Sequence, residues 1–467
     1  MKRKNSTSSK DTTSSHPKAL HKEKYLCVAK EALKNLIYSK TISLTAREIL
    51  SQIASLLLKG YSIQEVFSKN TISEHARGSI HIYNLSNPMK IFWLAVMPEK
   101  MLSDNFFPQQ KLQEKEWIQL WAELGNLQNF AEQYTLCNID RYIEAKASEN
   151  YLETLLILVS HNFHTLPHCT LNLYKQPGIF TDALVSLYSQ MDKENKRGFL
   201  PAVLIPLAKE SFEKEKEKTL EKICHLALIT HKVSFQNHRE EVPEMHPWSL
   251  GSICLNLVQA AYKAGEGNLN VFWQEVRESF SFAVRAHLDQ KRFMLNLIKD
   301  GYMNFLADSP WNKIYKESNA VFFVEICGLA ESTLFLSKQT MAEEEGWEIA
   351  VQTLAYLCEL ARSSSAKHGI NLILCDLDRD EKTAHRFLKL DKKHFPSYSN
   401  NFSEYTKGPR MNALTNLNLK ERIQKEGELH RYIPSRIFLM PDIPKEDLPS
   451  LLQYAYEETH AFEISIV

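Results

Sequence analysis

The chain has 467 residues, of which 44% are hydrophobic and 24% are charged, as in globular proteins large enough for one large domain or several smaller ones. Lysine plus arginine and aspartate plus glutamate number 56 each, so no overall charge would attract nucleic acid or an anionic membrane. Glycine is scarce, with 14 residues, and neither a GxGxxG nor a GxxxxGK[ST] phosphate-binding loop is present.

The cysteine pattern indicates a reducing compartment. The eight cysteines include no CxxC pair, which argues against a disulfide framework and against a zinc ribbon. No apolar run is long enough to span a bilayer, and the first twenty residues lack the apolar core of a signal peptide. We therefore expect a cytoplasmic protein whose residues 1–18 form a disordered tail.

The first half of the chain predicts helices with a few strands. Residues 19–70 have a helical pattern, with one run from Thr45 to Leu58 that Gly60 would end. A short helix then turns through Gly78 into a strand with apolar residues at Ile80 and Ile82. Residues 110–160 predict two or three helices, 169–174 a strand, and 209–222, which alternate lysine and glutamate, a solvated helix.

The segment from His231 to Lys299 predicts a polar loop, a strand and a long helix. The loop covers residues 231–249, and the apolar strand covers 251–257. Of these parts, the loop is the one that could carry chemistry, because loops on a rigid scaffold often do. The helix has one face with three- and four-residue spacing, made by Phe272, Val276, Phe280, Ala283, His287, Leu288, Leu295 and Ile298.

The last third predicts further strands separated by a helix. Residues 321–329 are a candidate buried strand, residues 346–363 a helix, and residues 370–374 and 437–440 two more strands. Strands separated by helices of ten or more residues are typical of an α/β fold.

One histidine-rich stretch could bind a metal. His161, His164, His168 and Cys169 are types that hold zinc, but no second ligand pair stands at structural-site spacing. The favoured interpretation is a set of histidines that line a turn between a helix and a strand. The sequence therefore predicts no metal residue.

Two further sets of residues, Cys254 and the acidic residues after position 375, could serve either the fold or a chemical site. Cys254 lies in an apolar strand, which favours a buried core thiol over a nucleophile. Asp376, Asp378, Asp380 and Glu381 could bind Mg²⁺ or stabilise charge, but a solvated loop that caps the next helix is favoured. No Ser/His/Asp signature and no HExxH motif is present.

Several segments, in order over residues 72–467, resemble one enzyme family. They are Glu74–Leu85, Gly251–Leu257, Lys367–Leu372 with Thr383–Phe387 and Lys389–Pro396, Tyr405-Thr406, and Glu421–His430. Together they are similar to the anaerobic, class III ribonucleotide reductases of the glycyl-radical enzymes. The resemblance implies an α/β fold for residues 71–467, a ten-stranded α/β barrel of two half-barrels, preceded by an N-terminal helical segment over residues 19–70.

The resemblance also implies an activity, the reduction of ribonucleoside triphosphates. Members of the family use formate or a thiol as reductant, a thiyl cysteine on a loop inside the barrel, and a C-terminal glycine radical made by an iron–sulfur activase. The radical glycine follows a zinc module of two CxxC pairs.

The chain departs from the family at the reactive groups. It has no glycine after Gly427 and no cysteine after Cys375. The loop from Thr230 to Ser249 contains no cysteine, and Ser234 or Ser249 cannot replace one because an O–H bond is too strong to exchange a hydrogen atom with a cysteine or glycine radical. Residues 86–97 also lack a cysteine, and Lys407-Gly-Pro409 stands where the family has Asn-Ser-Ser.

The sequence thus predicts a ribonucleotide reductase-like pseudoenzyme without radical catalysis, with no catalytic, cofactor-binding or metal residue assigned. It could bind a nucleoside triphosphate, form a homodimer, or act as a regulator. Two alternatives remain open. One is an active subunit for deoxyribonucleotide synthesis and DNA replication that receives a glycyl radical from a separate polypeptide, and the other is a partner-interaction protein that reuses the fold.

Overall fold

The computed structural model describes the chain in segments. They are residues 46–97, 131–144, 168–173, 179–193, 201–237, 247–301, 319–377, 381–399, 402–412, 415–440 and 443–466. Internal contacts divide the chain into two units, residues 1–65 with 85–87, and residues 66–84 with 88–467.

The first unit contains α2 (Ala46–Tyr61), and the π-helix η1 (Ser62–Val66) begins in it. The prediction that Gly60 ends this helix is wrong, since α2 continues through Gly60 to Tyr61 and the helical path then widens into the π-turn.

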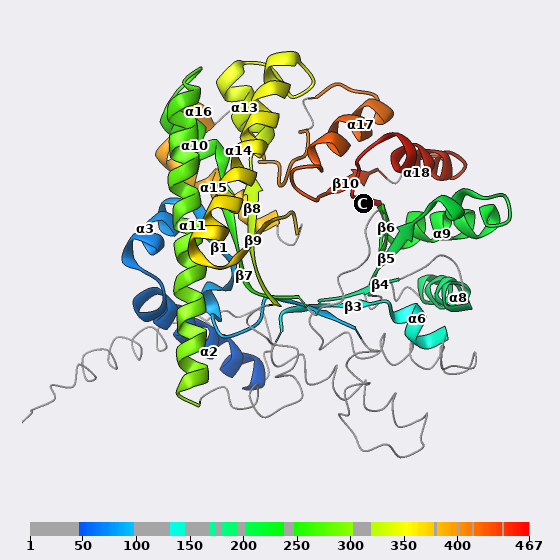
Figure 1. Ribbon diagram of the computed structural model, residues 1–467, viewed down its shortest axis with the longest axis horizontal. Coiled ribbons are helices and arrows are strands. Elements are labelled where there is room, and N and C mark those ends of the chain that lie inside the picture. The colour runs from blue at the N-terminus through cyan, green and yellow to red at the C-terminus, as the bar shows by residue number, and fades with distance from the viewer. Residues whose placement is uncertain are drawn as a thin grey trace, which may run out of the picture. The chain divides into compact units, whose positions relative to one another are not determined.

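The second unit is built on one large sheet (Figure 1). The hydrogen-bonded order is β10-β11-β6-β5-β4-β3-β2-β7-β8-β9, and β1 pairs with β7 outside this path. The strands are β1 (Ile80–Ile82), β2 (Trp93–Val96), β3 (Gln133–Cys137), β4 (His168–Asn172), β5 (Ala202–Leu207), β6 (Val233–Asn237), β7 (Trp248–Asn256), β8 (Ala320–Cys327), β9 (Asn371–Leu374), β10 (Arg436–Leu439) and β11 (Glu463–Ile466).

The strand directions divide the sheet into parallel groups. Neighbours β2 to β6 are parallel to one another, as are β7 to β9, and β10 is parallel to β11. The groups join through antiparallel pairs, β2 with β7 and β6 with β11. Beyond the ends of the path, the Asp376 N–H after β9 donates to the Pro434 carbonyl before β10, at 3.3 Å. The expected α/β fold with a large sheet is confirmed.

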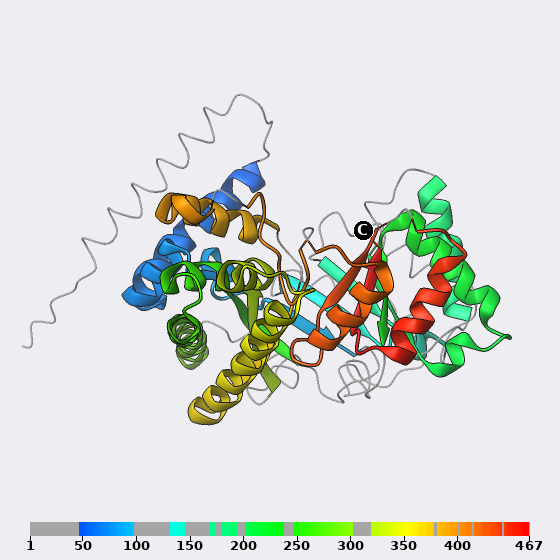
Figure 2. The same ribbon diagram turned by 90° about the horizontal axis from the view of Figure 1, so that it is seen from above.

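Helices cover one face of these strands (Figures 1 and 2). Beside β3 to β6, β10 and β11 lie α6 (Ile139–Glu144), α8 (Ile179–Lys193), η4 (Lys209–Phe212), α9 (Glu217–Thr230), α17 (Leu419–Leu429) and α18 (Asp447–Glu458). The other helices are α3 (Lys69–Arg77), η2 (Tyr83–Ser86), α10 (Leu257–Ala264), α11 (Leu269–Lys299), α13 (Leu329–Ser337), α14 (Glu344–His368), α15 (Glu381–His394) and α16 (Pro396–Ser399).

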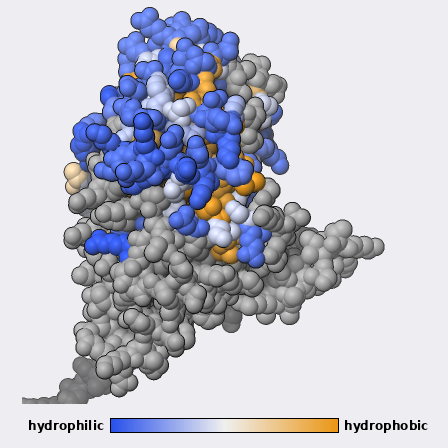
Figure 3. All heavy atoms as spheres, turned by 90° about the vertical axis from the view of Figure 1, so that its right-hand side faces the viewer, coloured by the Kyte–Doolittle hydropathy of each residue, from blue (hydrophilic) through white to orange (hydrophobic). Residues whose placement is uncertain are grey.

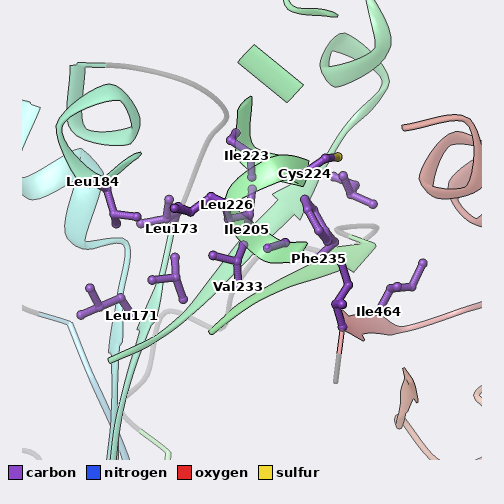
Figure 4. Packing of buried hydrophobic residues seen from close by; sticks show 14 of the residues in the cluster. Leu171, Leu173, Leu184, Ile205, Ile223, Cys224, Leu226, Val233, Phe235 and Ile464 are labelled. Atoms are coloured by element: carbon purple, nitrogen blue, oxygen red, sulfur yellow. The ribbon is translucent and has the colours of Figure 1, made fainter. Parts of the chain in front are cut away.

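The period of two along each strand gives the sheet an apolar and a more polar face. In β6, Val233 and Phe235 are buried in the core that α8, α9 and α18 close, together with Leu171, Ile205 and Ile464 from neighbouring strands (Figure 4). The residue between them, Ser234, points the other way and lines a cavity. We call the face with the helices the outer face and the opposite one the inner face.

The surface on the side of α8, α9 and α18 is mostly polar, in contrast to the apolar core that these helices cover. In the view that faces this side, polar side chains predominate over the described part, and apolar ones occupy smaller areas among them (Figure 3). This agrees with helices whose apolar residues are turned toward the sheet.

Local patterns predicted several elements correctly. The helix that turns through Gly78 is α3, where Gly78 has a φ of 91°, and β1 follows it. The strands expected at 251–257 and 321–329 are β7 and β8, and the long helix is α11. On that helix Leu295 and Ile298 are 41% and 42% exposed, so the apolar stripe is buried only in its N-terminal part.

Other predictions were wrong or incomplete. The segment 231–249, expected to be a loop, contains β6, whose apolar residues alternate within a polar surrounding. The helical interpretation of 110–160 missed β3, and no strand was predicted for β2, β5 or β11. The alternating Lys/Glu segment divides into η4 and the first turns of α9.

Candidate functional site

An extended segment, residues 405–411, crosses the carboxyl end of β8. Lys407 forms an antiparallel bridge with Cys327. The Gly328 N–H donates to the Thr406 carbonyl at 2.6 Å, and the Gly408 N–H donates to the Ile326 carbonyl at 2.9 Å. This segment, which we call the crossing segment, therefore adds backbone pairing at the inner side of the sheet.

Two thiols lie on the inner face next to the crossing segment. In the register of β7 and β8, Cys254 is opposite Glu325 and Asn256 is opposite Cys327, so both cysteines are on one face. Both are fully buried, with 0% exposure. Burial raises the pKa of each thiol well above its usual value, although the positive charge of Lys407 acts against this. Neither thiol is a thiolate nucleophile at neutral pH.

An ion pair anchors the crossing segment to the end of β9. Arg410 pairs with Asp376, and the Ser435 hydroxyl donates to Asp376 Oδ2 at 2.7 Å. The Asp376 side chain is 1% exposed. Burial alone would raise the pKa of this carboxyl, but Arg410, Ser435 and Lys407 together lower it. The interpretation of Asp376 as part of a solvated loop is wrong, because Arg410 and Ser435 supply the interactions that water would otherwise provide.

Buried carboxylates hold both ends of the crossing segment. Glu331 at the start of α13 accepts hydrogen bonds from the Thr406 N–H at 3.0 Å and the Thr406 hydroxyl at 2.7 Å. Glu426 in α17 accepts from the Met411 N–H at 2.9 Å and pairs with Arg422 at 3.1 Å. Burial raises the pKa of both carboxyl groups, and the hydrogen bonds offset part of this effect.

Tyr405 fixes the beginning of the crossing segment against α15. Its hydroxyl donates to Asp391 Oδ2 at 3.2 Å. The same carboxylate accepts from Asn256 Nδ2 and Gln259 Nε2, each at 2.9 Å. Asn256 also caps α10, so the junction of β7 and α10 and the crossing segment share one carboxylate.

Lys407 contributes a buried positive charge to this site. The residue is 7% exposed, and its ammonium nitrogen is buried with no hydrogen-bond partner among the described residues. Its charge contributes to the lowered pKa of Asp376, and it offsets part of the increase that burial causes in the pKa of Cys254 and Cys327. A buried ammonium without a hydrogen-bond acceptor is energetically costly, so the site favours an added anion.

A cavity of about 230 Å³ lies on the inner face of β4, β5, β6, β10 and β11. Ser234, Arg436 and Glu463 are among the residues that line it. Phe438, which also lines it, stacks with the Arg410 guanidinium at 4.4 Å from the ring centroid. The cavity and the Lys407 site are therefore linked through Arg410 and Phe438.

The residues that the sequence offered as metal ligands do not come together in the described part of the structure. Cys169 is buried on the outer face, and burial raises its pKa to about 12. His168 begins β4, Glu381 begins α15, and within the described segments no three His, Cys, Asp or Glu residues are grouped to hold a metal ion. His161, His164, Asp378 and Asp380 lie outside the described residues.

Four residues of the segment 230–249 have defined contacts in the structure. Ser234 shares a hydrogen bond of 2.6 Å with Ser465, and Ser249 donates to the Gly251 carbonyl at 2.9 Å. Phe235 is buried on the outer face, so it does not fill the inner side, and the partly buried Trp248 packs against the same core.

Sequence reasoning did not assign Lys407, Arg410 or Ser435 to a site. The only signal was the replacement of the family's Asn-Ser-Ser by Lys407-Gly-Pro409. None of the helices in the described segments has the length and apolar character to cross a bilayer.

Comparisons with known proteins agree with the resemblance. The model of the family described as "Anaerobic ribonucleoside-triphosphate reductase" matches residues 146–438. No curated protein matches the chain. A crystal structure of the anaerobic ribonucleotide reductase from Thermotoga maritima, with citrate in the active site, aligns with a TM-score of 0.72 and 13% identity over 95% of this chain and 94% of that chain.

Another solved anaerobic ribonucleotide reductase aligns with a TM-score of 0.73 and 12% identity, over 95% of this chain and 83% of that chain. The B12-independent glycerol dehydratase from Clostridium butyricum aligns with a TM-score of 0.51 and 10% identity, over 95% and 71% of the two chains. At these identities the structural similarity concerns the fold, whereas the family match covers more than half of the chain. The chain therefore belongs to the anaerobic ribonucleoside-triphosphate reductase family.

Proposed function

We propose that this chain binds a nucleoside triphosphate at the Lys407 site and does not reduce its ribose. The observation that carries the proposal is the buried Lys407 ammonium, which has no hydrogen-bond partner among the described residues. A phosphate oxygen would supply the missing acceptor, and a charge-assisted hydrogen bond is stronger than a neutral one.

The relatives support a nucleotide as the anion. Structures of the Thermotoga maritima enzyme have been solved with dATP in the specificity site, and with dATP and CTP. The scaffold that this chain shares with them therefore accommodates nucleotides in that protein.

The thiols support the absence of reduction. The segment from Thr230 to Ser249, which stands where the family has the loop with its thiyl cysteine, has no cysteine. The nearest described thiols, Cys254 and Cys327, are fully buried beside the crossing segment. A thiol that must exchange a hydrogen atom with a substrate ribose has to touch that ribose, and the segment that would present such a thiol contains none.

Equilibrium titration with each of the eight NTPs and dNTPs tests the binding. At least one is expected to bind with a dissociation constant below about 1 mM. Lys407→Met should weaken this binding at least tenfold, corresponding to about 1.4 kcal/mol. Lys367→Met, which removes an equal charge from an exposed position of α14, should leave it unchanged. Equal effects of both variants, or no binding at all, would refute the proposal.

A turnover assay tests the second part. The chain is incubated with each ribonucleotide, formate or a dithiol, an activase of the family and a separate polypeptide that carries an activatable radical glycine, and deoxynucleotides are measured. None is expected. Formation of a deoxynucleotide would instead favour the active subunit that receives its radical from another polypeptide.

A further inference from the structure

We propose that the 230 Å³ cavity binds a second and smaller ligand that carries a phosphate or carboxylate group. This site is lined by residues of β4, β5, β6, β10 and β11 and does not include Lys407. The inference therefore goes beyond nucleotide binding and can be tested separately from it.

The charge of the lining favours an anion. His231, Lys232 and Arg436 line the cavity, whereas Glu463 is the one carboxylate among the described residues that line it. Arg436 Nε is 2.6 Å from Glu463 Oε1, so this pair is already neutralised. The structure records no hydrogen bond or ion pair for the terminal nitrogens of Arg436 or for the Lys232 ammonium among the described residues.

The geometry of Arg436 is suited to an oxyanion. A guanidinium can donate two parallel hydrogen bonds to a carboxylate or a phosphate, and among the described residues the Arg436 Nε, although 2.6 Å from Glu463 Oε1, has no hydrogen-bond partner. The Lys232 ammonium adds a second positive charge, which can pair with a carboxylate or with a phosphate. The cavity therefore combines a fork-shaped donor with a second cationic group.

Hydroxyl groups complete the polar side of the cavity. Ser465 Oγ donates to Glu463 Oε1 at 3.4 Å and is 2.6 Å from Ser234 Oγ. With its single proton directed to Glu463, Ser465 must accept from Ser234. Thr170 adds another hydroxyl to the lining, which can donate to an anion.

The size of the cavity limits the ligand. Pockets for drug-sized ligands have roughly 300–1,000 Å³, so a cavity of about 230 Å³ is too small for a nucleoside triphosphate. Leu204 and Phe438 provide apolar walls, and the Phe438 ring is held by Arg410. The expected ligand is a compact anion with a short apolar body.

Titration calorimetry of the full chain with inorganic phosphate and, separately, with succinate tests the proposal. Glu463→Gln removes the competing carboxylate and should tighten binding at least threefold. The double variant Arg436→Met with Glu463→Gln removes both charges of the pair, so no buried charge is left alone, and should weaken binding at least tenfold. Lys222→Met, on the exposed side of α9, is the matched control and should have no effect.

The outcomes separate the two proposals. Binding of phosphate, succinate or both, with opposite effects of the single and double variants, supports the cavity site and identifies the anion. The absence of binding by both probes would overturn it. So would a loss of binding in Lys407→Met with no change in the double variant, because the anion would then occupy the nucleotide site. A thermal unfolding transition like that of the parent chain verifies that each variant is folded.

Discussion

Gly408 contacts the buried carboxylate of Asp376 so closely that a Cβ built at position 408 would overlap Asp376 Oδ2. The backbone of Gly408 also has a φ of 65°, in the left-handed region. This glycine therefore lets the crossing segment pass over the Asp376–Arg410 pair, a contact that any side chain would disturb.

Gly408→Ala should lower the free energy of unfolding by about 3 kcal/mol, the sum of left-handed strain and an overpacked contact. Gly369→Ala is the control, because Gly369 has a φ of 62° but no atom within 4 Å of its built Cβ. It should lose only about 1 kcal/mol. Urea unfolding measures both changes, and equal losses would show that the contact with Asp376 has no energetic effect.

Two buried histidines predict a loss of stability in acid. Burial lowers the pKa of His287 to about 4 and that of His430 to about 3. His287 Nε2 is 2.9 Å from the Phe323 carbonyl, and His430 Nδ1 accepts from the Phe462 N–H at 3.0 Å. Because both folded-state pKa values lie below the unfolded value of about 6.5, the unfolded chain binds more protons in this range. Their stabilisation is present above pH about 6.5 and is lost as the pH falls toward the folded-state values.

Near pH 5 the two histidines together should contribute a slope of about 2.5 kcal/mol per pH unit to the free energy of unfolding. His287→Gln should reduce the slope by about half of this amount, even if it also changes the stability itself. The control His368→Gln, at an exposed position, should leave the slope unchanged. Urea unfolding between pH 8 and pH 5 measures the slopes, and the same slope in all three proteins would contradict the assignment.

Tyr405 should stabilise the fold more when Asp391 is ionised. Burial raises the pKa of Asp391 to about 6, although hydrogen bonds from Gln259, Asn256 and Tyr405 oppose this. Since this folded-state pKa is above the unfolded value, the contribution of Asp391 to stability is largest below pH about 4 and is lost as the pH rises through about 6. This trend opposes that of the histidines.

Tyr405→Phe removes the hydrogen bond to Asp391 Oδ2. It should therefore cost about 2 kcal/mol at pH 7.5, where the acceptor is charged, and about 1 kcal/mol at pH 5, where it is mostly neutral. Tyr398→Phe, at a residue that is 36% exposed, is the matched control and should cost little at either pH. Urea unfolding at the two pH values gives the comparison. A cost for Tyr405→Phe that does not depend on pH would refute the role of Asp391.

The sequence predicted the elements whose evidence is local. The turn through Gly78 and the apolar runs of β7 and β8 are recognisable without knowledge of their neighbours. In contrast, β6 alternates apolar and polar residues over only five positions and is a strand because β5 and β11 lie on either side of it. Its Ser234 is paired with Ser465, 231 residues away, and no local pattern identifies such a partner.

By itself the sequence determined the family, the α/β class, and the absence of a cysteine from the segment 230–249. Only the tertiary structure decided that Asp376 is buried against Arg410, and that Lys407 lies beside Cys327 without a hydrogen-bond partner among the described residues. The physical reason is that a sequence pattern defines local geometry, whereas burial and pairing of a charge depend on residues that are distant along the chain. In this protein, the crossing segment brings those residues together.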